Sequence, residues 1–104
     1  MGRAEVSPLP QASAFAALAN DGEYCAPVKV TEARDNEYEI PEANCEQTLD
    51  SDLVAQLNET LIPIAEERTA DSDRQYPMTG KTETNNFESS TWCNGYTTGL
   101  SFST

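Results

Sequence analysis

The segment Thr79-Gly80-Lys81-Thr82-Glu83-Thr84, followed after a short polar stretch by Thr91-Trp92-Cys93-Asn94-Gly95-Tyr96, decides the fold of this chain. Threonine and aromatic residues favour β-strands, whereas asparagine and glycine favour the turns between strands. Such turn signals stand at Asn85-Asn86 and Thr98-Gly99. The sequence therefore predicts a meander of antiparallel strands over residues 77–104, with strands at 77–82, 91–96 and 100–104.

A helix rich in alanine is predicted over residues 7–20, upstream of this meander. Ser7 stands where a side chain caps the free backbone N–H groups of a helix, and Pro8 takes the first helical position. Asn20-Asp21-Gly22 supplies the stop signal. Small residues along this helix would let it pack closely on a neighbour.

A second helix is predicted over residues 51–65, with Asp50 or Ser51 as its cap. Pro63 is expected to kink or end it, because proline lacks the N–H that the helix needs. Its apolar residues fall on one side at helical spacing: Leu53, Val54, Leu57, Leu61 and Ile64.

A surface hairpin is predicted over residues 27–40, between the two helices. Val28 and Val30 alternate with polar residues as in a half-buried strand, and Asp35-Asn36 is a turn signal before a return strand. Residues 41–48 and 66–75 are expected to be irregular. The order of helix, hairpin, helix and meander predicts an α+β fold, with helices packed on a face of an antiparallel sheet.

The charge of the chain excludes two classes of partner. With 104 residues and a net charge of −12, it would repel nucleic-acid phosphate and anionic lipid. No apolar run is long enough for a membrane span, and residues 1–5 lack the apolar stretch of a secretion signal. We therefore expect any export signal or anchor to lie outside this sequence. The length fits one domain or part of a larger one.

Three cysteines allow at most one bridge within the chain. Cys25 and Cys45 are the predicted pair, each beside a turn-forming or extended segment; the alternative is that both are buried thiols. Cys93 follows Trp92 in a strand-like run and is expected to be a small packing residue.

The residues offer few routes to chemistry. The chain has no histidine, which removes Ser-His and Cys-His pairs and most transition-metal sites. We predict no metal and no cofactor. Gly80-Lys81-Thr82 does not end a phosphate-binding loop, because that motif needs glycine at position 75, which is Gln75. Trp92 and Tyr96 are expected to be packing residues, and the Asn58-Glu59-Thr60 sequon lies on a predicted helix, which argues against its glycosylation.

The tripeptide Gly80-Lys81-Thr82 has a second interpretation. A Lys-Thr-Gly strand is the third motif of the penicillin-recognising enzymes, beside Ser-x-x-Lys and Ser-x-Asn. Residues 6–22 resemble the helix between the second and third motifs of penicillin-binding protein transpeptidase domains. Residues 79–82 and 91–97 resemble the third motif and the strand after it. The resemblance covers nearly the whole chain and is closest to bifunctional (class A) proteins of actinobacteria.

This resemblance implies part of a penicillin-binding transpeptidase (β-lactamase-like) fold. In that family a serine attacks a stem peptide of peptidoglycan, and β-lactams acylate the same serine. Lys81 would supply positive charge beside the nucleophile, Thr82 and Thr84 would bind the substrate carboxylate, and the Thr84 N–H would form half of the oxyanion hole. The implied partners are a stem peptide or β-lactam and the missing N-terminal half of the domain. The implied location is extracytoplasmic or at the cell surface.

The chain departs from the family pattern in two ways. The residues three before its only lysines, Lys29 and Lys81, are Ala26 and Met78, so it holds no Ser-x-x-Lys, and it holds no Ser-x-Asn. Glu83 also stands where the family has glycine. We therefore expect a fragment or truncated copy of a D,D-transpeptidase domain that is catalytically incomplete alone. The alternative is a repurposed, non-catalytic cell-wall or protein-interaction module.

Overall fold

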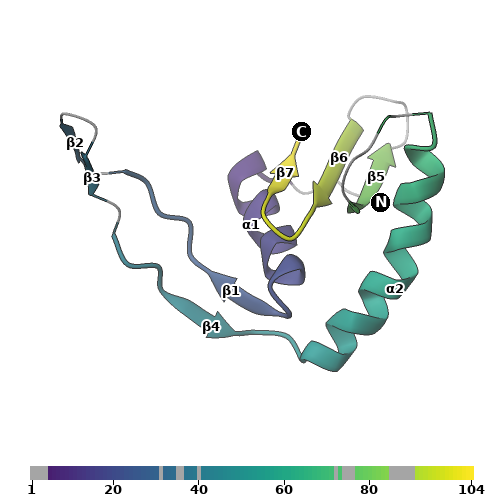
Figure 1. Ribbon diagram of the computed structural model, residues 1–104, viewed down its shortest axis with the longest axis horizontal. Helices are drawn as coiled ribbons and strands as arrows, with labels where there is room; N and C mark the ends of the chain where they lie inside the picture. Colours follow the sequence, from purple (N-terminus) through teal and green to yellow (C-terminus); the bar gives the residue numbers. More distant parts are fainter. Residues whose placement is uncertain are drawn as a thin grey trace.

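The computed structural model describes residues 5–30, 32–34, 37–39, 41–71, 73, 77–84 and 91–104. Its elements, in chain order, are α1 (Pro8–Ala19), β1 (Glu23–Cys25), β2 (Glu32–Arg34), β3 (Glu37–Glu39), β4 (Cys45–Gln47), α2 (Ser51–Arg68), β5 (Thr79–Thr84), β6 (Thr91–Tyr96) and β7 (Ser101–Ser103). The two helices lie beside the antiparallel sheet β5-β6-β7, while the paired strands β2 and β3 lie away from it at the end of an extended arm (Figure 1). This arrangement is a small α+β fold. None of the described helices has the length and apolar character to cross a bilayer.

Helix α1 begins at Pro8 and ends at Ala19, inside the range predicted from the sequence. The Ser7 side chain makes no capping hydrogen bond, so that part of the prediction is wrong. The stop signal acts through Gly22, whose N–H donates to the Ala17 carbonyl at 2.8 Å and whose φ is +90°. A side chain there would also meet the Leu49 carbonyl oxygen at 2.5 Å, so glycine is required where α1 turns into β1.

Helix α2 runs from Ser51 to Arg68, beyond the predicted end at residue 65. The Asp50 carboxylate caps it by accepting from the N–H groups of Asp52 (3.0 Å) and Leu53 (3.1 Å). Pro63 lies inside the helix and does not end it. The last turn is held because Ala65 is buried and its carbonyl accepts from the N–H of Thr69 at 3.1 Å.

The buried side of α2 differs from its most apolar side. Val54 is 1% exposed, whereas Leu53, Leu57 and Ile64 are 59%, 39% and 36% exposed. Successive helical residues are about 100° apart, so Val54 and Ala65 lie about 20° from each other, whereas the other three lie about 60–100° from Val54 on one side of it. The five apolar residues predicted to share one side therefore divide: Val54 is buried, Leu61 is partly buried and the other three are exposed.

The arm begins with a pairing that the sequence did not suggest. β1 and β4 are antiparallel, with Cys25 opposite Cys45, so the expectation of irregular structure at residues 41–48 is wrong for 45–47. The hairpin predicted over residues 27–40 is also wrong for residues 27–30, which have no strand structure. Val28 and Val30 are 45% and 48% exposed, so they are not buried as one face of a half-buried strand would be.

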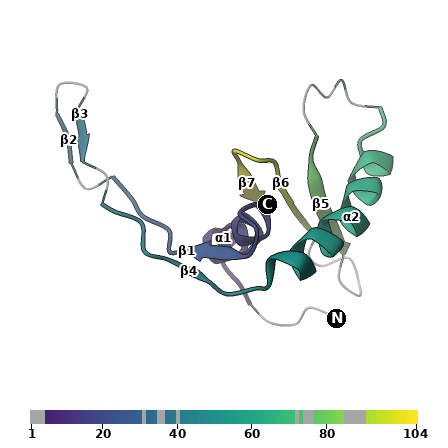
Figure 2. The same ribbon diagram turned by 60° about the horizontal axis from the view of Figure 1, so that its bottom comes forward.

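The hairpin itself forms further along the arm, where β2 pairs with β3 and Ala33 lies opposite Tyr38. Both views show this pair at the far end of the arm, beyond β1 and β4 (Figure 2). The predicted turn Asp35-Asn36 and Ile40 lie outside the described residues.

A disulfide joins Cys25 and Cys45 at the base of the arm. The Ala26 N–H donates to the Asn44 carbonyl at 3.0 Å, and the Thr48 N–H donates to the Gly22 carbonyl at 3.0 Å. Because hydrogen-bonded and non-hydrogen-bonded pairs alternate along an antiparallel ladder, the two cysteines form a non-hydrogen-bonded pair, the closer of the two kinds. Their Cα atoms are 4.0 Å apart. The ladder thus brings the two sulfur atoms together.

Replacing both bridge cysteines with serine should lower the free energy of unfolding by about 3 kcal/mol, because the bridge closes a loop of intermediate length in the unfolded chain. Denaturant titration of the Cys25→Ser/Cys45→Ser variant measures this loss. Cys93 is free, so Cys93→Ser is the control and should change stability far less. Equal denaturant midpoints for the double variant and the parent would contradict the prediction.

Candidate functional site

The candidate site is the outer strand of the three-stranded sheet. β5 pairs only with β6 among the described strands, and its register sets Lys81 opposite Asn94, Thr82 opposite Cys93 and Glu83 opposite Trp92. β6 in turn pairs with β7 on its other side. The side chains of residues 81–84 are all exposed.

The hydrogen-bond ladder determines which backbone groups of β5 face outward. Cys93 exchanges both of its backbone hydrogen bonds with Thr104, at 2.8 and 3.0 Å, so its N–H and C=O point toward β7. Because these directions alternate along a strand, Asn94 points toward β5 and pairs with Lys81. The N–H and C=O groups of Thr82 and Thr84 then point away from β6. The strand thus carries a row of outward donors and acceptors.

The structure therefore gathers the predicted residues Lys81, Thr82 and Thr84 on one strand, but in two settings. Thr82 and Thr84 share the outward edge, whereas the backbone of Lys81 faces inward. The Lys81 Nζ donates to the Thr82 carbonyl oxygen, which brings its ammonium group to that same edge. A cation thus lies beside outward N–H groups, an arrangement that attracts an anionic group.

The close approach of β5 and β6 depends on Gly80. A Cβ at this position would lie 2.7 Å from the Asn94 carbonyl oxygen and 3.2 Å from the Cα of Gly95. A Cβ on Gly95, which is opposite Gly80 in the register, would lie 2.6 Å from the Phe102 ring. The Gly80–Gly95 pair therefore keeps the site strand at its position in the sheet.

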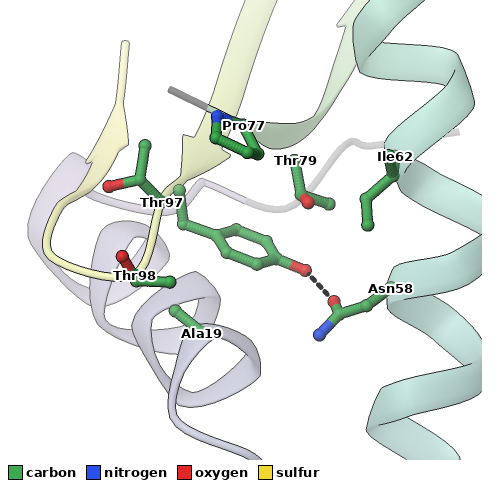
Figure 3. A pocket seen from close by; sticks show the side chains of 8 residues that line it. Ala19, Asn58, Ile62, Pro77, Thr79, Thr97 and Thr98 are labelled. Carbon is green, nitrogen blue, oxygen red and sulfur yellow. Dashed lines mark hydrogen bonds between the residues drawn. The ribbon is translucent and has the colours of Figure 1, made fainter. Parts of the chain in front are cut away.

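Tyr96 anchors this sheet to both helices. Its side chain is 4% exposed, its ring centroid lies 6.1 Å from that of Phe15 in α1, and its hydroxyl donates to the Asn58 Oδ1 of α2 (Figure 3). The Asn58 amide nitrogen also donates to the Leu18 carbonyl at 3.4 Å. The structure thus uses the asparagine of the sequon as an internal hydrogen-bonding group.

A hollow of about 180 Å³ lies beside this contact. Tyr96, Asn58, Thr79 and Ile62 are among the residues that line it (Figure 3). Sequence reasoning identified Tyr96 as a packing residue but missed Asn58, because no local pattern shows that a helical asparagine meets a strand so far along the chain. Trp92 and Cys93 are partly buried in β6.

One group of residues resembles a metal site by proximity alone. The ligand atoms of Glu23, Cys25 and Cys45 lie within 4.8 Å of one another. Because the two sulfur atoms form a disulfide, they are not the thiolates that bind metals. This group therefore offers a single carboxylate.

One family model matches most of this chain. The family model of the penicillin binding protein transpeptidase domain matches residues 1–100. The chain therefore belongs to the penicillin-binding protein transpeptidase domain family. The search of curated proteins found no match.

Gly80→Ala should destabilise the protein by about 1–3 kcal/mol, because the new methyl group meets backbone atoms that cannot rotate away. A Cβ at Gly99 would meet nothing within 4 Å, so Gly99→Ala is the matched control. Thermal unfolding of the two variants measures the difference. A Gly80→Ala protein as stable as Gly99→Ala would show that the strands do not approach as described.

Stability should fall with rising pH in the alkaline range through Tyr96. Burial raises the pKa of Tyr96, so the folded protein holds the phenol proton more tightly than the unfolded chain does. This contribution is fully present below the ordinary tyrosine pKa of about 10 and is lost as pH rises through the higher folded-state value. Denaturant titrations across this range should show a shallower decline for Tyr96→Phe; an unchanged slope would contradict the assignment.

Proposed function

We propose that this chain is the C-terminal part of the transpeptidase domain of a bifunctional (class A) penicillin-binding protein of the actinobacterial type. In this proposal β5 is the strand that binds the carboxylate end of a peptidoglycan stem peptide or of a β-lactam. The observation that carries it is the outward edge of β5, where the N–H groups of Thr82 and Thr84 lie beside the Lys81 ammonium group. Membership of the transpeptidase family supports it.

The residues of β5 would each have a distinct role. Lys81 attracts the carboxylate and supplies positive charge next to the attacking serine. The Thr82 and Thr84 hydroxyls donate hydrogen bonds to that carboxylate. The outward N–H of Thr84 forms half of the oxyanion hole, where a donor that is already oriented stabilises the transition state more than the ground state.

The serine and its base would come from polypeptide outside these 104 residues, since the sequence holds no Ser-x-x-Lys and no Ser-x-Asn. The N-terminal part of the domain is the partner that would supply them. An extracytoplasmic location fits both the family and the Cys25–Cys45 disulfide, because disulfides persist in oxidising compartments.

A second candidate function is a repurposed binding module without catalysis. Glu83 favours it, because a carboxylate on the exposed strand repels an anionic ligand. In that case β5 would still bind cell-wall peptide or a protein partner, but no reaction would follow.

A fluorescent penicillin tests whether this chain holds a nucleophile, and acetylated Lys-D-Ala-D-Ala tests whether β5 binds a peptide. The chain should acquire no covalent label, because it lacks the nucleophile, yet the peptide should shift the amide NMR signals of residues 81–84. Lys81→Met should weaken peptide binding about five-fold, the loss expected for one exposed charge contact.

Lys29→Met is the control, since Lys29 is exposed and lies outside β5. A covalent penicillin adduct would refute the claim that the nucleophile comes from elsewhere. Peptide binding that is equal in the Lys81→Met and Lys29→Met variants would refute the role of the strand.

A further inference from the structure

Three side chains with metal-ligating atoms lie on one face of the β1–β4 ladder, at the base of the arm. Glu23 and Cys25 share that face because side chains alternate along a strand, and Cys45 lies opposite Cys25. Their carboxylate oxygen and sulfur atoms lie within 4.8 Å of one another. The disulfide occupies both sulfur atoms in the structure. Breaking it would place two thiols beside a carboxylate.

The disulfide is accessible to a thiol reductant. Cys45 is exposed and Cys25 is only partly buried. A dithiol supplies two electrons and two protons: the Cys25–Cys45 bond breaks, each cysteine becomes a thiol, and the dithiol closes into its own disulfide. The reduced state is therefore reached with the chain still folded around the arm, provided that other contacts hold the two strands.

Hydrogen bonds on both sides of the cysteine pair hold the two strands together. On one side the Ala26 N–H donates to the Asn44 carbonyl at 3.0 Å. On the other side the Gly22 carbonyl accepts from the Thr48 N–H at 3.0 Å and from the Thr48 hydroxyl at 3.1 Å. These bonds do not involve the sulfur atoms, so the reduced cysteines stay opposite each other.

The Glu23 carboxylate is already oriented by a neighbour. The Asn20 Nδ2 at the end of α1 donates to the Glu23 Oε2 at 3.0 Å. Carboxylates that bind metals are typically held by such hydrogen bonds, and each carboxylate has a second oxygen to offer. The net charge of −12 adds a general attraction for cations.

We propose that the reduced chain binds a zinc-class divalent cation through the Cys25 and Cys45 thiolates and the Glu23 carboxylate. Two sulfur ligands and one carboxylate suit Zn²⁺, whereas Ca²⁺ and Mg²⁺ require oxygen ligands. Ligand atoms about 2.0–2.3 Å from a tetrahedral Zn²⁺ lie roughly 3.5 Å apart, so side-chain rotations are enough to close the site. Water takes the fourth position. Each thiol passes its proton to the buffer when the metal binds.

This metal site would replace the covalent link at the base of the arm. In the oxidised chain the disulfide joins β1 to β4, and in the reduced chain the cation joins the same two strands through the same two residues. Because a ligand that binds only the folded state stabilises it, Zn²⁺ should raise the thermal midpoint of the reduced chain and leave that of the oxidised chain unchanged.

The test uses Co²⁺ as a spectroscopic substitute for Zn²⁺. The full chain is reduced with dithiothreitol, freed of the reductant under argon and titrated with Co²⁺. A near-ultraviolet band from thiolate-to-cobalt charge transfer should appear, saturate at a single metal per chain and disappear when Zn²⁺ is added. The oxidised chain should show no band. Cys93→Ser should leave the band unchanged, because Cys93 lies in β6.

Glu23→Gln should weaken Zn²⁺ binding about ten-fold, the lower end of the loss found when even a supporting group around a metal is removed. Displacement of Co²⁺ measures this affinity. Glu46→Gln is the matched control: Glu46 is exposed and belongs to the same ladder, but its side chain lies on the face opposite to that of Cys45. The affinity of this control should change far less. Circular dichroism verifies that both variants fold.

Four results would overturn the inference. The reduced chain shows no thiolate band, or the band saturates at one metal for every two chains. Glu23→Gln and Glu46→Gln bind Zn²⁺ equally, so the carboxylate of Glu23 is not a ligand. The thermal midpoint of the reduced chain is the same with and without Zn²⁺, so the metal does not replace the link.

Discussion

The contact between Tyr96 and Asn58 is the interaction on which the body of this structure depends. Tyr96 ends β6, and its ring packs near Phe15 of α1 while its hydroxyl donates to Asn58 of α2. The buried apolar residues that the structure describes are otherwise small: Ala17, Val54 and Ala65. With so little buried volume, one large aromatic side chain with a satisfied hydroxyl contributes a large share of the packing.

The same sheet explains how Lys81, Thr82 and Thr84 come to lie along one exposed edge. The ladder between β6 and β7 determines which backbone groups of β6 point toward β7 and which point toward β5. The register of β5 on β6 then determines which backbone groups of β5 point inward and which point outward. Gly80 and Gly95 permit the approach that this register needs. The outward donors at Thr82 and Thr84 are therefore a consequence of strand pairing, and the side chains add charge and hydroxyl groups to an edge that already exists.

The features that sequence reasoning could predict are those encoded by neighbouring residues. Pro8 and Asn20-Asp21-Gly22 bracket α1, the Asp50 carboxylate caps α2, and β-prone runs give the meander. What could not be predicted depends on distant partners. The β1–β4 ladder joins two segments that are separated along the chain. The buried side of α2 is set by its contacts with β5 and by the Asn58 hydrogen bond to α1, so Leu53 is exposed although it is more apolar than the buried Ala65.

The position of Glu83 explains how the strand tolerates a residue so unlike the glycine that the family resemblance implies. Its N–H and C=O face inward and pair with Trp92, whereas the outward groups belong to Thr82 and Thr84. A change of side chain at position 83 therefore leaves the hydrogen-bonding edge in place and alters only the charge and bulk beside it. A changed side chain at position 83 and an unchanged hydrogen-bonding edge are thus compatible in one strand, because strand pairing determines the edge and the side chain determines only the charge beside it.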